Sequence, residues 1–532
     1  MSADTDVLII GGGMSGIGLA AQLCRHYASS ATRFEIYEKT ADIGGTWAIN
    51  TYPGCGVDVP SQFYSYSFAL NPNWSRKFTM QDEILDYFHR VAAQYGLPRH
   101  TRLQCMVERA VWDQRRMIWI VTIRDLAAKR TFQRTCRALV SAVGALSVPK
   151  KCDIPGYDDF QGRLFHSARW DHEFDHAGKD ILVLGNGCSA TQFVPVVAQT
   201  ANRVVQVARQ PHWLLERPNP TYSRAFQLFM RVPGVMRLLR AKIYAELEAE
   251  WTMFETDTGI EARKKLGEAS KKYIRENAPP EYVDALIPKF EVGCKRRVFD
   301  TGYLECLHRK NVELVSDDGV ERITKTGVVF RSGRTLDVDA IVLATGFETT
   351  TLLSPLDIVG KGGVTITQHW DKHNQGFPQA YYGTCIAGFP NFFVMMGPNT
   401  VNGHLSVIYS SECQINFTLR MLDPILRSPE HKVAAVEIRQ EAETAENAWI
   451  QDRARQLVWS TGCTNWYVEP KTAKNLMVYP HWQWHYWLRS IFIPRKDVVY
   501  MSRDGKEILG AVTVWWMIMS AVMYFVRPLL AV

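Results

Sequence analysis

Closely spaced cysteine pairs and long runs of one charge are missing from this sequence of 532 residues. Its eleven cysteines show no CxxC spacing, so we expect neither a zinc site nor a disulfide framework, but reduced thiols in a reducing compartment. The net charge of +7 is spread over the chain with no basic run interleaved with aromatic residues, which excludes a nucleic-acid-binding protein. A strand is expected from about Asp6, so we expect no signal peptide before it.

The remaining composition is that of an ordinary globular protein. Hydrophobic residues make up 46% of the chain and charged residues 22%. A chain of this length can bury the cores of two or three domains. Composition therefore indicates a multidomain globular protein and leaves its chemistry to the motifs.

One long apolar run lies near the C-terminus. Residues 508–526 carry no charge, and nineteen residues can cross a bilayer core as a helix. The run contains Trp515 and Trp516, and basic residues flank it. It is apolar on all sides, which favours lipid over a protein surface, with a buried C-terminal helix as the alternative. We therefore predict a single transmembrane helix and a membrane localisation, with the rest of the chain in the cytosol.

A glycine-rich turn near the N-terminus has the pattern of a dinucleotide site. Residues 6–10 form an apolar strand, residues 17–27 have a helical pattern, and a second strand ends in the acidic residue Glu38. Small residues let the backbone approach a pyrophosphate, the helix N-terminus attracts it, and the acid accepts hydrogen bonds from a ribose. The small residues predicted to bind the nucleotide are Gly11, Gly13, Ser15 and Gly16.

A second turn of the same kind follows in the middle of the chain. A strand at residues 180–184 precedes it, and the strand at residues 204–208 is followed by Arg209, where an NAD site would have an acid. A guanidinium suits a 2′-phosphate, so we predict NADPH rather than NADH. The small residues predicted to line this site are Gly185, Gly187, Ser189 and Ala190.

Two further motifs identify a family. Residues 160–171 follow the spacing Phe-x-Gly-x3-His-x3-Trp-Asp, and residues 45–58 follow Gly-x-Trp-x4-Tyr-Pro-Gly-x3-Asp. Both resemble the signatures of the Baeyer–Villiger monooxygenases, which are FAD-binding flavoproteins. The resemblance covers about residues 6 to 500. Related flavin monooxygenases usually lack the final pair, which is Trp170-Asp171 here.

The resemblance implies a reaction and a set of residues. In this family NADPH reduces a flavin, the flavin activates O2, and a ketone becomes an ester or lactone. An arginine stabilises the anionic oxygen species, and the run Lys-Arg-x3-Asp-x-Gly-Tyr selects Arg296, next to Lys295. Arg297 stays open as an alternative if the register shifts by one residue. Asp58 would orient the arginine, and the further residues implied to bind the cofactors are Thr46, Trp47, Tyr64 and Val107.

The two nucleotide motifs and the linkers between them define the expected architecture. We predict an α/β fold with two Rossmann-like domains, one for FAD and one for NADPH, and a C-terminal hydrophobic helix. The FAD domain takes residues 1–148 and 347–502, and the NADPH domain takes residues 149–346. A helical insertion occupies about residues 222–290.

Other functions on this scaffold stay open. A flavin-dependent hydroxylase or dehydrogenase needs the same two cofactors, whereas the cysteine spacing does not fit a disulfide reductase. A non-catalytic binding protein leaves two complete nucleotide motifs unexplained. The expected partners are a small-molecule ketone, O2 and the membrane, with no metal. Membrane tethering and many aromatics favour an apolar substrate such as a secondary-metabolite intermediate, but no motif reports its shape.

Overall fold

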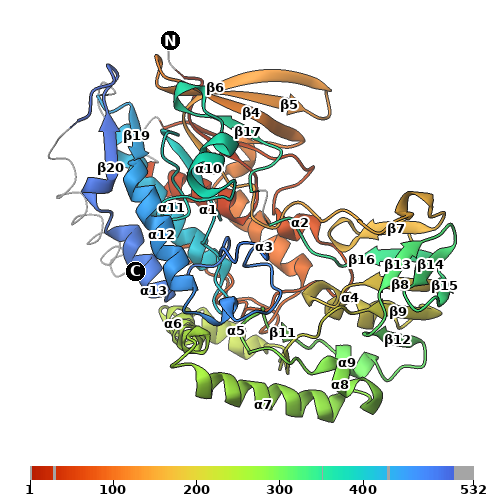
Figure 1. The fold of residues 1–532 in the computed structure, drawn as a ribbon. Helices are drawn as coiled ribbons and strands as arrows, with labels where there is room; N and C mark the ends of the chain where they lie inside the picture. Colours follow the sequence, from red (N-terminus) through yellow and green to blue (C-terminus); the bar gives the residue numbers. More distant parts are fainter. Residues whose placement is uncertain (1–2, 28–31, 350–351, 428–431, 509–532) are drawn as a thin grey trace.

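Two sheets and a set of covering helices make up the protein, as the computed structural model shows for residues 3–27, 32–349, 352–427 and 432–508 (Figure 1). The first sheet has the order β17-β4-β5-β6-β1-β2-β3, with β18 paired to β6. The second sheet has the order β12-β9-β8-β16-β7. In Figure 1 the first sheet is at the top and the second at the right, with helices below and to the left.

The first sheet is built around β1, which pairs in parallel with β2 and β6. Val7 to Ile9 in β1 are fully buried, because helices cover this part of the sheet. Beyond β6 the sheet becomes antiparallel through β5 and β4. Its elements are β1 (Thr5–Ile10), α1 (Met14–Tyr27), β2 (Phe34–Tyr37), α2 (Thr46–Ile49), α3 (Gln81–Gln94), β3 (Thr101–Arg102), β4 (Cys105–Asp113), β5 (Ile118–Asp125) and β6 (Arg130–Ser141).

The second sheet is entirely parallel, as alternating strands and helices require. Its central strand β8 lies between β16 and β9, so residues 181–184 are buried and apolar. Its elements are β7 (Arg163–His166), β8 (Asp180–Leu184), α4 (Cys188–Val197), β9 (Arg203–Val207), α9 (Tyr303–Cys306), β12 (Val312–Val315) and β16 (Ala340–Leu343). A small antiparallel sheet packs beside it: β13 (Val320–Ile323), β14 (Gly327–Phe330) and β15 (Thr335–Asp337).

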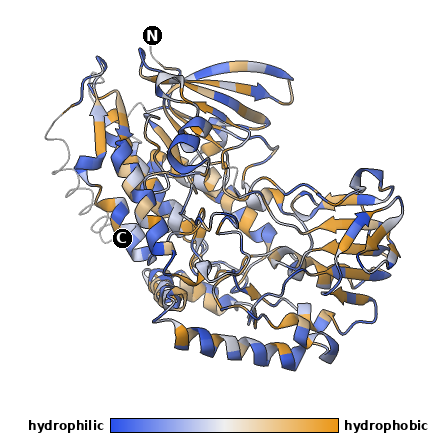
Figure 2. Ribbon diagram, in the orientation of Figure 1, coloured by the Kyte–Doolittle hydropathy of each residue, from blue (hydrophilic) through white to orange (hydrophobic). Residues whose placement is uncertain are grey.

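A helical segment separates β9 from the end of the second sheet. In Figure 2 the strands of the second sheet are mainly hydrophobic, whereas α7 mixes hydrophilic and hydrophobic residues along its length. This amphipathic pattern suits a helix that packs one face on the body of the protein. The segment contains β10 (Leu214–Leu215), α5 (Arg224–Met230), α6 (Val235–Ala249), α7 (Ile260–Asn277), α8 (Val283–Leu286) and β11 (Val298–Phe299).

The chain then returns to the first sheet. Two strands join it, and α11 packs against α1 beneath it. The returning elements are β17 (Asp357–Val359), α10 (Ile366–Asn374), β18 (Phe392–Val394), α11 (Val407–Leu426), β19 (Ala435–Ile438), α12 (Gln440–Ala454), α13 (Gln483–Ile491) and β20 (Val498–Met501).

The outgoing and returning connections run side by side. Lys150 donates its backbone N–H to the carbonyl of Gly346 at 3.0 Å, and Glu348 donates to Val148 at 2.9 Å. His166 from the Phe-x-Gly-x3-His motif contacts the same Gly346 carbonyl through Nε2 at 3.0 Å. The motif at residues 160–171 therefore contacts the paired segments that connect the two sheets.

The membrane prediction needs correction. Apart from Ile508, the apolar run at 508–526 lies outside the described residues. Within the described ranges no helix is both long and apolar enough to cross a membrane. The 20-residue helix α11, for example, carries Glu412, Arg420 and Asp423. The predicted membrane localisation and C-terminal membrane helix are therefore not retained.

The expectation of unpaired thiols also needs correction. Cys294 and Cys463 form a disulfide between residues 169 positions apart. The other nine cysteines are free. Two cysteines so far apart form no recognisable spacing pattern in the sequence, because only the fold brings them together.

Candidate active site

The first glycine turn lies at the end of β1. Gly11 has φ of +104°, and a Cβ there would lie 2.6 Å from the carbonyl oxygen of Ala142. Only glycine fits both conditions. Glu38, at the end of β2, accepts a hydrogen bond from the Gly12 backbone N–H at 2.7 Å. The turn and the acidic residue thus meet as a dinucleotide site requires.

The loop after β2 closes over this turn. Gly44 donates its N–H to the Gly12 carbonyl at 2.9 Å, and a Cβ at Gly45 would lie 2.8 Å from Gly13 Cα. Thr46 then opens α2. Trp47, the second residue of α2, donates its indole N–H to the Tyr64 hydroxyl at 3.0 Å. The loop therefore fits around a nucleotide bound at the first turn.

Two predicted residues at this site have other contacts as well. Ser15 accepts a hydrogen bond from Ser411 of α11 at 2.8 Å, so it also joins the two parts of the first sheet's domain. Val107 lies in β4, where the pairing with β5 shifts register before Arg109. Cys105, two residues earlier, donates its N–H to the carbonyl of Glu38 at 2.8 Å. Val107 thus lies close to the acidic end of the site.

The second glycine turn repeats the first. Gly185 has φ of +113°, and a Cβ there would lie 2.5 Å from the Ala344 carbonyl. Nothing lies within 4 Å of a Cβ built on Gly187, so its outer side is open. Ala190 is fully buried in α4, and Ser189 lies in the first turn of that helix. The open N-terminus of α4 suits a phosphate group.

Beside this turn lies a cavity of about 290 Å³, whose lining includes Asn186, Arg209 and Gln210. Lys295 donates to the Gln210 amide oxygen at 2.5 Å. Burial and the nearby charge of Arg209 both lower the pKa of Lys295. In the part of the chain that the structure describes, neither cation forms an ion pair with a carboxylate. Arg209 and Lys289 line the cavity together with one acidic residue, Asp284, and Lys295 interacts with Arg209 from outside the lining. This excess of cations favours an anionic ligand.

The two nucleotide sites meet at the loop of residues 52–58. Gln192 of α4 accepts a hydrogen bond from the Tyr52 hydroxyl at 3.0 Å and donates one to the Gly56 carbonyl at 3.1 Å. A Cβ on Gly54 would lie 2.5 Å from the Gln192 carbonyl. The second signature motif therefore packs directly on the first helix of the second nucleotide fold.

Asp58 and Arg296 form an ion pair at this junction. Asp58 Oδ2 lies 2.7 Å from Nη2 and 2.8 Å from Nε of Arg296, and the side chains are 28% and 26% exposed. Burial alone would lower the pKa of Arg296, but the charge of Asp58, the hydrogen bond to it and the neighbouring Tyr467 and Cys188 together raise that pKa. Arg297 instead pairs with Glu250 of the helical segment. The geometry thus distinguishes the two neighbouring arginines, and only Arg296 meets Asp58.

The structure adds three residues that the sequence did not single out. Cys188, exposed at the start of α4, interacts electrostatically with Asp58 and Arg296. Arg217 donates to the Val57 carbonyl, in the loop that carries Asp58. Tyr467, from the far end of the chain, is buried and interacts electrostatically with Arg296. Arg217 and Tyr467 stand in no motif, and only Cys188, inside the second glycine turn, offered a signal in the sequence.

Most predicted residues therefore gather at two glycine turns and the junction between them. Arg209 lines the cavity with Lys295 near it, and Asp58 and Arg296 lie at the junction. No cluster of three or more potential metal ligands occurs among the described residues.

Known proteins share both the sequence and the fold. Residues 4–253 match the flavin-binding monooxygenase-like family. A Baeyer–Villiger monooxygenase of Pseudomonas aeruginosa is 34% identical over 90% of this chain and 88% of its own. One from Streptomyces coelicolor is 35% identical over 89% and 88%.

Solved structures agree with these relatives. A steroid monooxygenase bound to NADP has a TM-score of 0.78 at 27% identity, covering 93% of this chain and 99% of its own. OTEMO in complex with FAD and NADP has a TM-score of 0.80 at 27% identity, covering 92% and 97%. Identity above 30% over nine tenths of the chain, together with both signature motifs, shows that this chain belongs to the Baeyer–Villiger monooxygenase family.

Proposed function

We propose that this enzyme uses NADPH, FAD and O2 to insert one oxygen atom next to a ketone carbonyl, giving an ester or a lactone. The observation that carries the proposal is the Asp58–Arg296 ion pair at the junction between the two nucleotide folds. A flavin bound at the first glycine turn and a nicotinamide bound at the second would approach each other at this junction, next to the charge of Arg296. The family membership supports the same reaction.

The residues at the first turn fit FAD. Gly11 and Gly13 leave room for a pyrophosphate, and Glu38 can accept hydrogen bonds from the ribose. The hydrogen bond between Trp47 and Tyr64 holds the loop that closes over the first turn. Bound FAD would supply hydride acceptance and oxygen activation, chemistry that no side chain provides. The protein's own part is therefore to bind, orient and stabilise charge.

The residues at the second turn fit NADPH. Gly187 faces open space at the N-terminus of α4, and Arg209 borders the adjacent cavity with Lys295 close by. The 2′-phosphate of NADPH carries negative charge that would balance these cations, and a guanidinium can bind a phosphate through two hydrogen bonds. NADPH is therefore the preferred nicotinamide cofactor.

Arg296 would stabilise negative charge that develops on oxygen during the reaction. Asp58 raises the pKa of Arg296, so the guanidinium stays charged throughout the working pH range. Both bonds to Asp58 use Nε and Nη2, so Nη1 has no hydrogen-bond partner within the described ranges. That N–H group is available to an anionic oxygen atom.

The substrate is a ketone whose shape stays open. The expectation of an apolar, secondary-metabolite substrate rested partly on membrane tethering, which is not retained. Trp251, Phe254 and Trp459 form a buried aromatic core between the helical segment and the returning chain, so they do not report the polarity of the ketone. We keep the predicted boundaries as part of the proposal: an FAD domain of residues 1–148 and 347–502, and an NADPH domain of residues 149–346 with its insertion at about 222–290.

The test is product analysis under oxygen-18 gas. Purified enzyme with NADPH and a panel of cyclic and linear ketones should give esters or lactones that carry one labelled oxygen. Hydroxylated products would favour the alternative hydroxylase, and oxidised products without label would favour a dehydrogenase. Either result would reject the Baeyer–Villiger assignment for this chain.

A further inference from the structure

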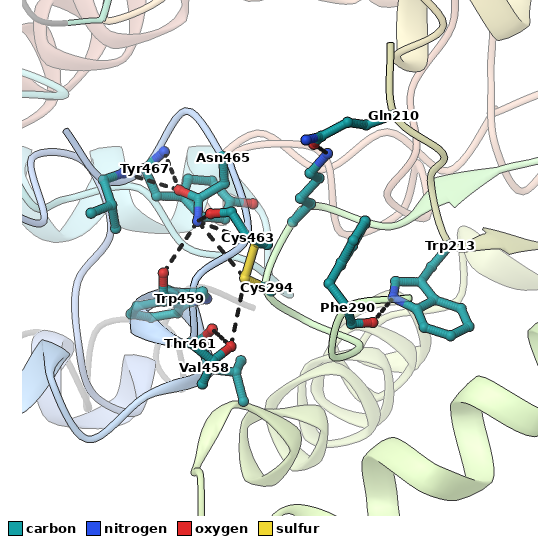
Figure 3. Close-up of a disulfide and its surroundings, with 12 residues drawn as sticks. Gln210, Trp213, Phe290, Cys294, Val458, Trp459, Thr461, Cys463, Asn465 and Tyr467 are labelled. Carbon is teal, nitrogen blue, oxygen red and sulfur yellow. Dashed lines mark hydrogen bonds between the residues drawn. A yellow bond between two sulfur atoms is a disulfide. The ribbon is translucent and has the colours of Figure 1, made fainter. Parts of the chain in front are cut away.

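A loop from the far end of the chain reaches the proposed site. Residues 461–474, the cysteine-anchored loop, are joined to the segment before Arg296 by the Cys294–Cys463 disulfide (Figure 3). Asn465 fixes the turn, because its side-chain oxygen accepts from the backbone N–H groups of Tyr467 and Val468 at 2.9 and 3.0 Å. The loop therefore holds Tyr467 in a defined position next to the segment that carries Arg296.

The ring of Tyr467 is packed, but its hydroxyl has no partner. The residue is 1% exposed, and its ring contacts those of Trp459 and Trp466. Its buried hydroxyl makes no hydrogen bond to any described residue. Burying a hydroxyl without a partner costs folding free energy. A phenylalanine here would keep the packing and avoid that cost.

The charged groups around this ring belong to the proposed site. Tyr467 interacts electrostatically with Arg296, and more weakly with Cys188 and Asp58. Arg296 uses only its Nε and Nη2 edge, and both bonds go to one oxygen of Asp58. A guanidinium held at one oxygen can pivot about it, so Asp58 alone does not fix its orientation.

We propose that Tyr467 is a second positioning residue for Arg296, whose guanidinium donates to the Tyr467 hydroxyl when cofactors and substrate are bound. Asp58 and Tyr467 then hold the arginine at two points, and the group facing the reacting oxygen is fixed. This inference rests on the proposed function. It gives the unpartnered hydroxyl a role in the loaded enzyme that offsets its cost in the free one.

The experiment compares Tyr467→Phe with Tyr381→Phe. Tyr381 is also buried, but its hydroxyl donates to Asp497 at 2.8 Å, outside the proposed site. We expect Tyr467→Phe to lower ester turnover about tenfold or more, because a hydrogen bond to a charged group is lost. Reduction of the flavin by NADPH should keep its rate, the KM for the ketone should change little, and hydrogen peroxide should replace ester.

Thermal unfolding of the same proteins separates positioning from structure. Tyr467→Phe should melt at the wild-type temperature or above it, since no bond is lost in the free enzyme. Tyr381→Phe should melt lower and keep its turnover. Equal turnover by Tyr467→Phe and wild type would overturn the inference and leave the proposed function standing. A parallel loss of flavin reduction, ester formation and melting temperature would mark Tyr467 as structural only. A wild-type enzyme that makes no ester would overturn both.

Discussion

Asp58 holds Arg296 through a single carboxylate oxygen, Oδ2, which accepts from Nε at 2.8 Å and from Nη2 at 2.7 Å. The pair joins a loop of the first nucleotide fold to the segment after the disulfide. Neither residue is near the other in sequence, so the contact depends on the packing of the two halves of the molecule.

Loss of Arg296 should impair ester formation but not the reduction of the flavin by NADPH. Arg296→Ala should lower ester formation about a hundredfold or more, since one preorganised donor to an oxyanion is worth about 2.7–4 kcal/mol. Flavin reduction by NADPH should persist, with oxygen released as hydrogen peroxide. Arg296→Lys should not restore product, because a point charge cannot reproduce the planar group held by Asp58.

Stopped-flow reduction followed by product analysis measures both steps. Asp58→Ala should show the same defect less severely, because it acts through orientation. Arg297→Ala is the matched control, since that arginine pairs with Glu250 instead. A normal ester yield from Arg296→Ala would falsify its role.

Two glycine substitutions should each weaken the binding of one cofactor. A Cβ on Gly13 would meet only Gly45, at 3.4 Å or more, and a Cβ on Gly187 would meet no protein atom within 4 Å. Both Gly13→Ala and Gly187→Ala should therefore fold, yet obstruct a pyrophosphate. The first should lose bound FAD, seen as loss of yellow colour. The second should keep FAD and raise the KM for NADPH. Full FAD occupancy in Gly13→Ala would show that the first turn is misassigned.

The cofactor preference should depend on Arg209. Arg209→Ala should raise the Kd for NADPH about tenfold or more, as a charge-assisted pair is worth roughly 1.5–3 kcal/mol. Affinity for NADH, which lacks the 2′-phosphate, should hardly change. Arg331→Ala, on an exposed arginine after β14, is the control. An equal loss with both cofactors would make Arg209 a structural residue.

The disulfide can be counted directly. Unfolded, unreduced protein should expose nine reactive thiols, and eleven after reduction. Cys463→Ser should lower the free energy of unfolding by about 2–5 kcal/mol, because it frees a long loop in the unfolded chain. Cys413→Ser leaves the pairing intact and serves as the comparison. Eleven thiols before reduction would restore the expectation drawn from the sequence.

Mild acid should destabilise the protein partly through His212. Burial and the charge of Lys295 lower the pKa of His212 to about 4. An unfolded histidine titrates near 6.5, so between these values the unfolded state binds more protons and stability falls as pH falls. His212→Gln should reduce the loss of unfolding free energy between pH 7 and 5 by about 2 kcal/mol, measured by urea unfolding.

The sequence was sufficient to predict the sites that are formed by residues close together along the chain. Glycine turns followed by helices, such as Gly11 with α1, are local patterns, and the structure places them after β1 and β8 as predicted. The Asp58–Arg296 contact was found through family motifs. Tyr467 and the Cys294–Cys463 pair could not be found, because contacts between residues more than 160 positions apart leave no periodicity or spacing to read. The membrane helix expected at residues 508–526 was based on hydropathy alone, and no helix within the described ranges could span a membrane.

The paired connections between the two sheets have a mechanical consequence. Backbone bonds tie Val148 to Glu348 and Lys150 to Gly346, so the chain enters and leaves the second sheet through one paired connection. Away from this connection, Gln192 of α4 binds Tyr52 and Gly56 in the loop that carries Asp58. A rotation of the second sheet about the paired connection would have to break these hydrogen bonds, and it would strain the Asp58–Arg296 ion pair as well.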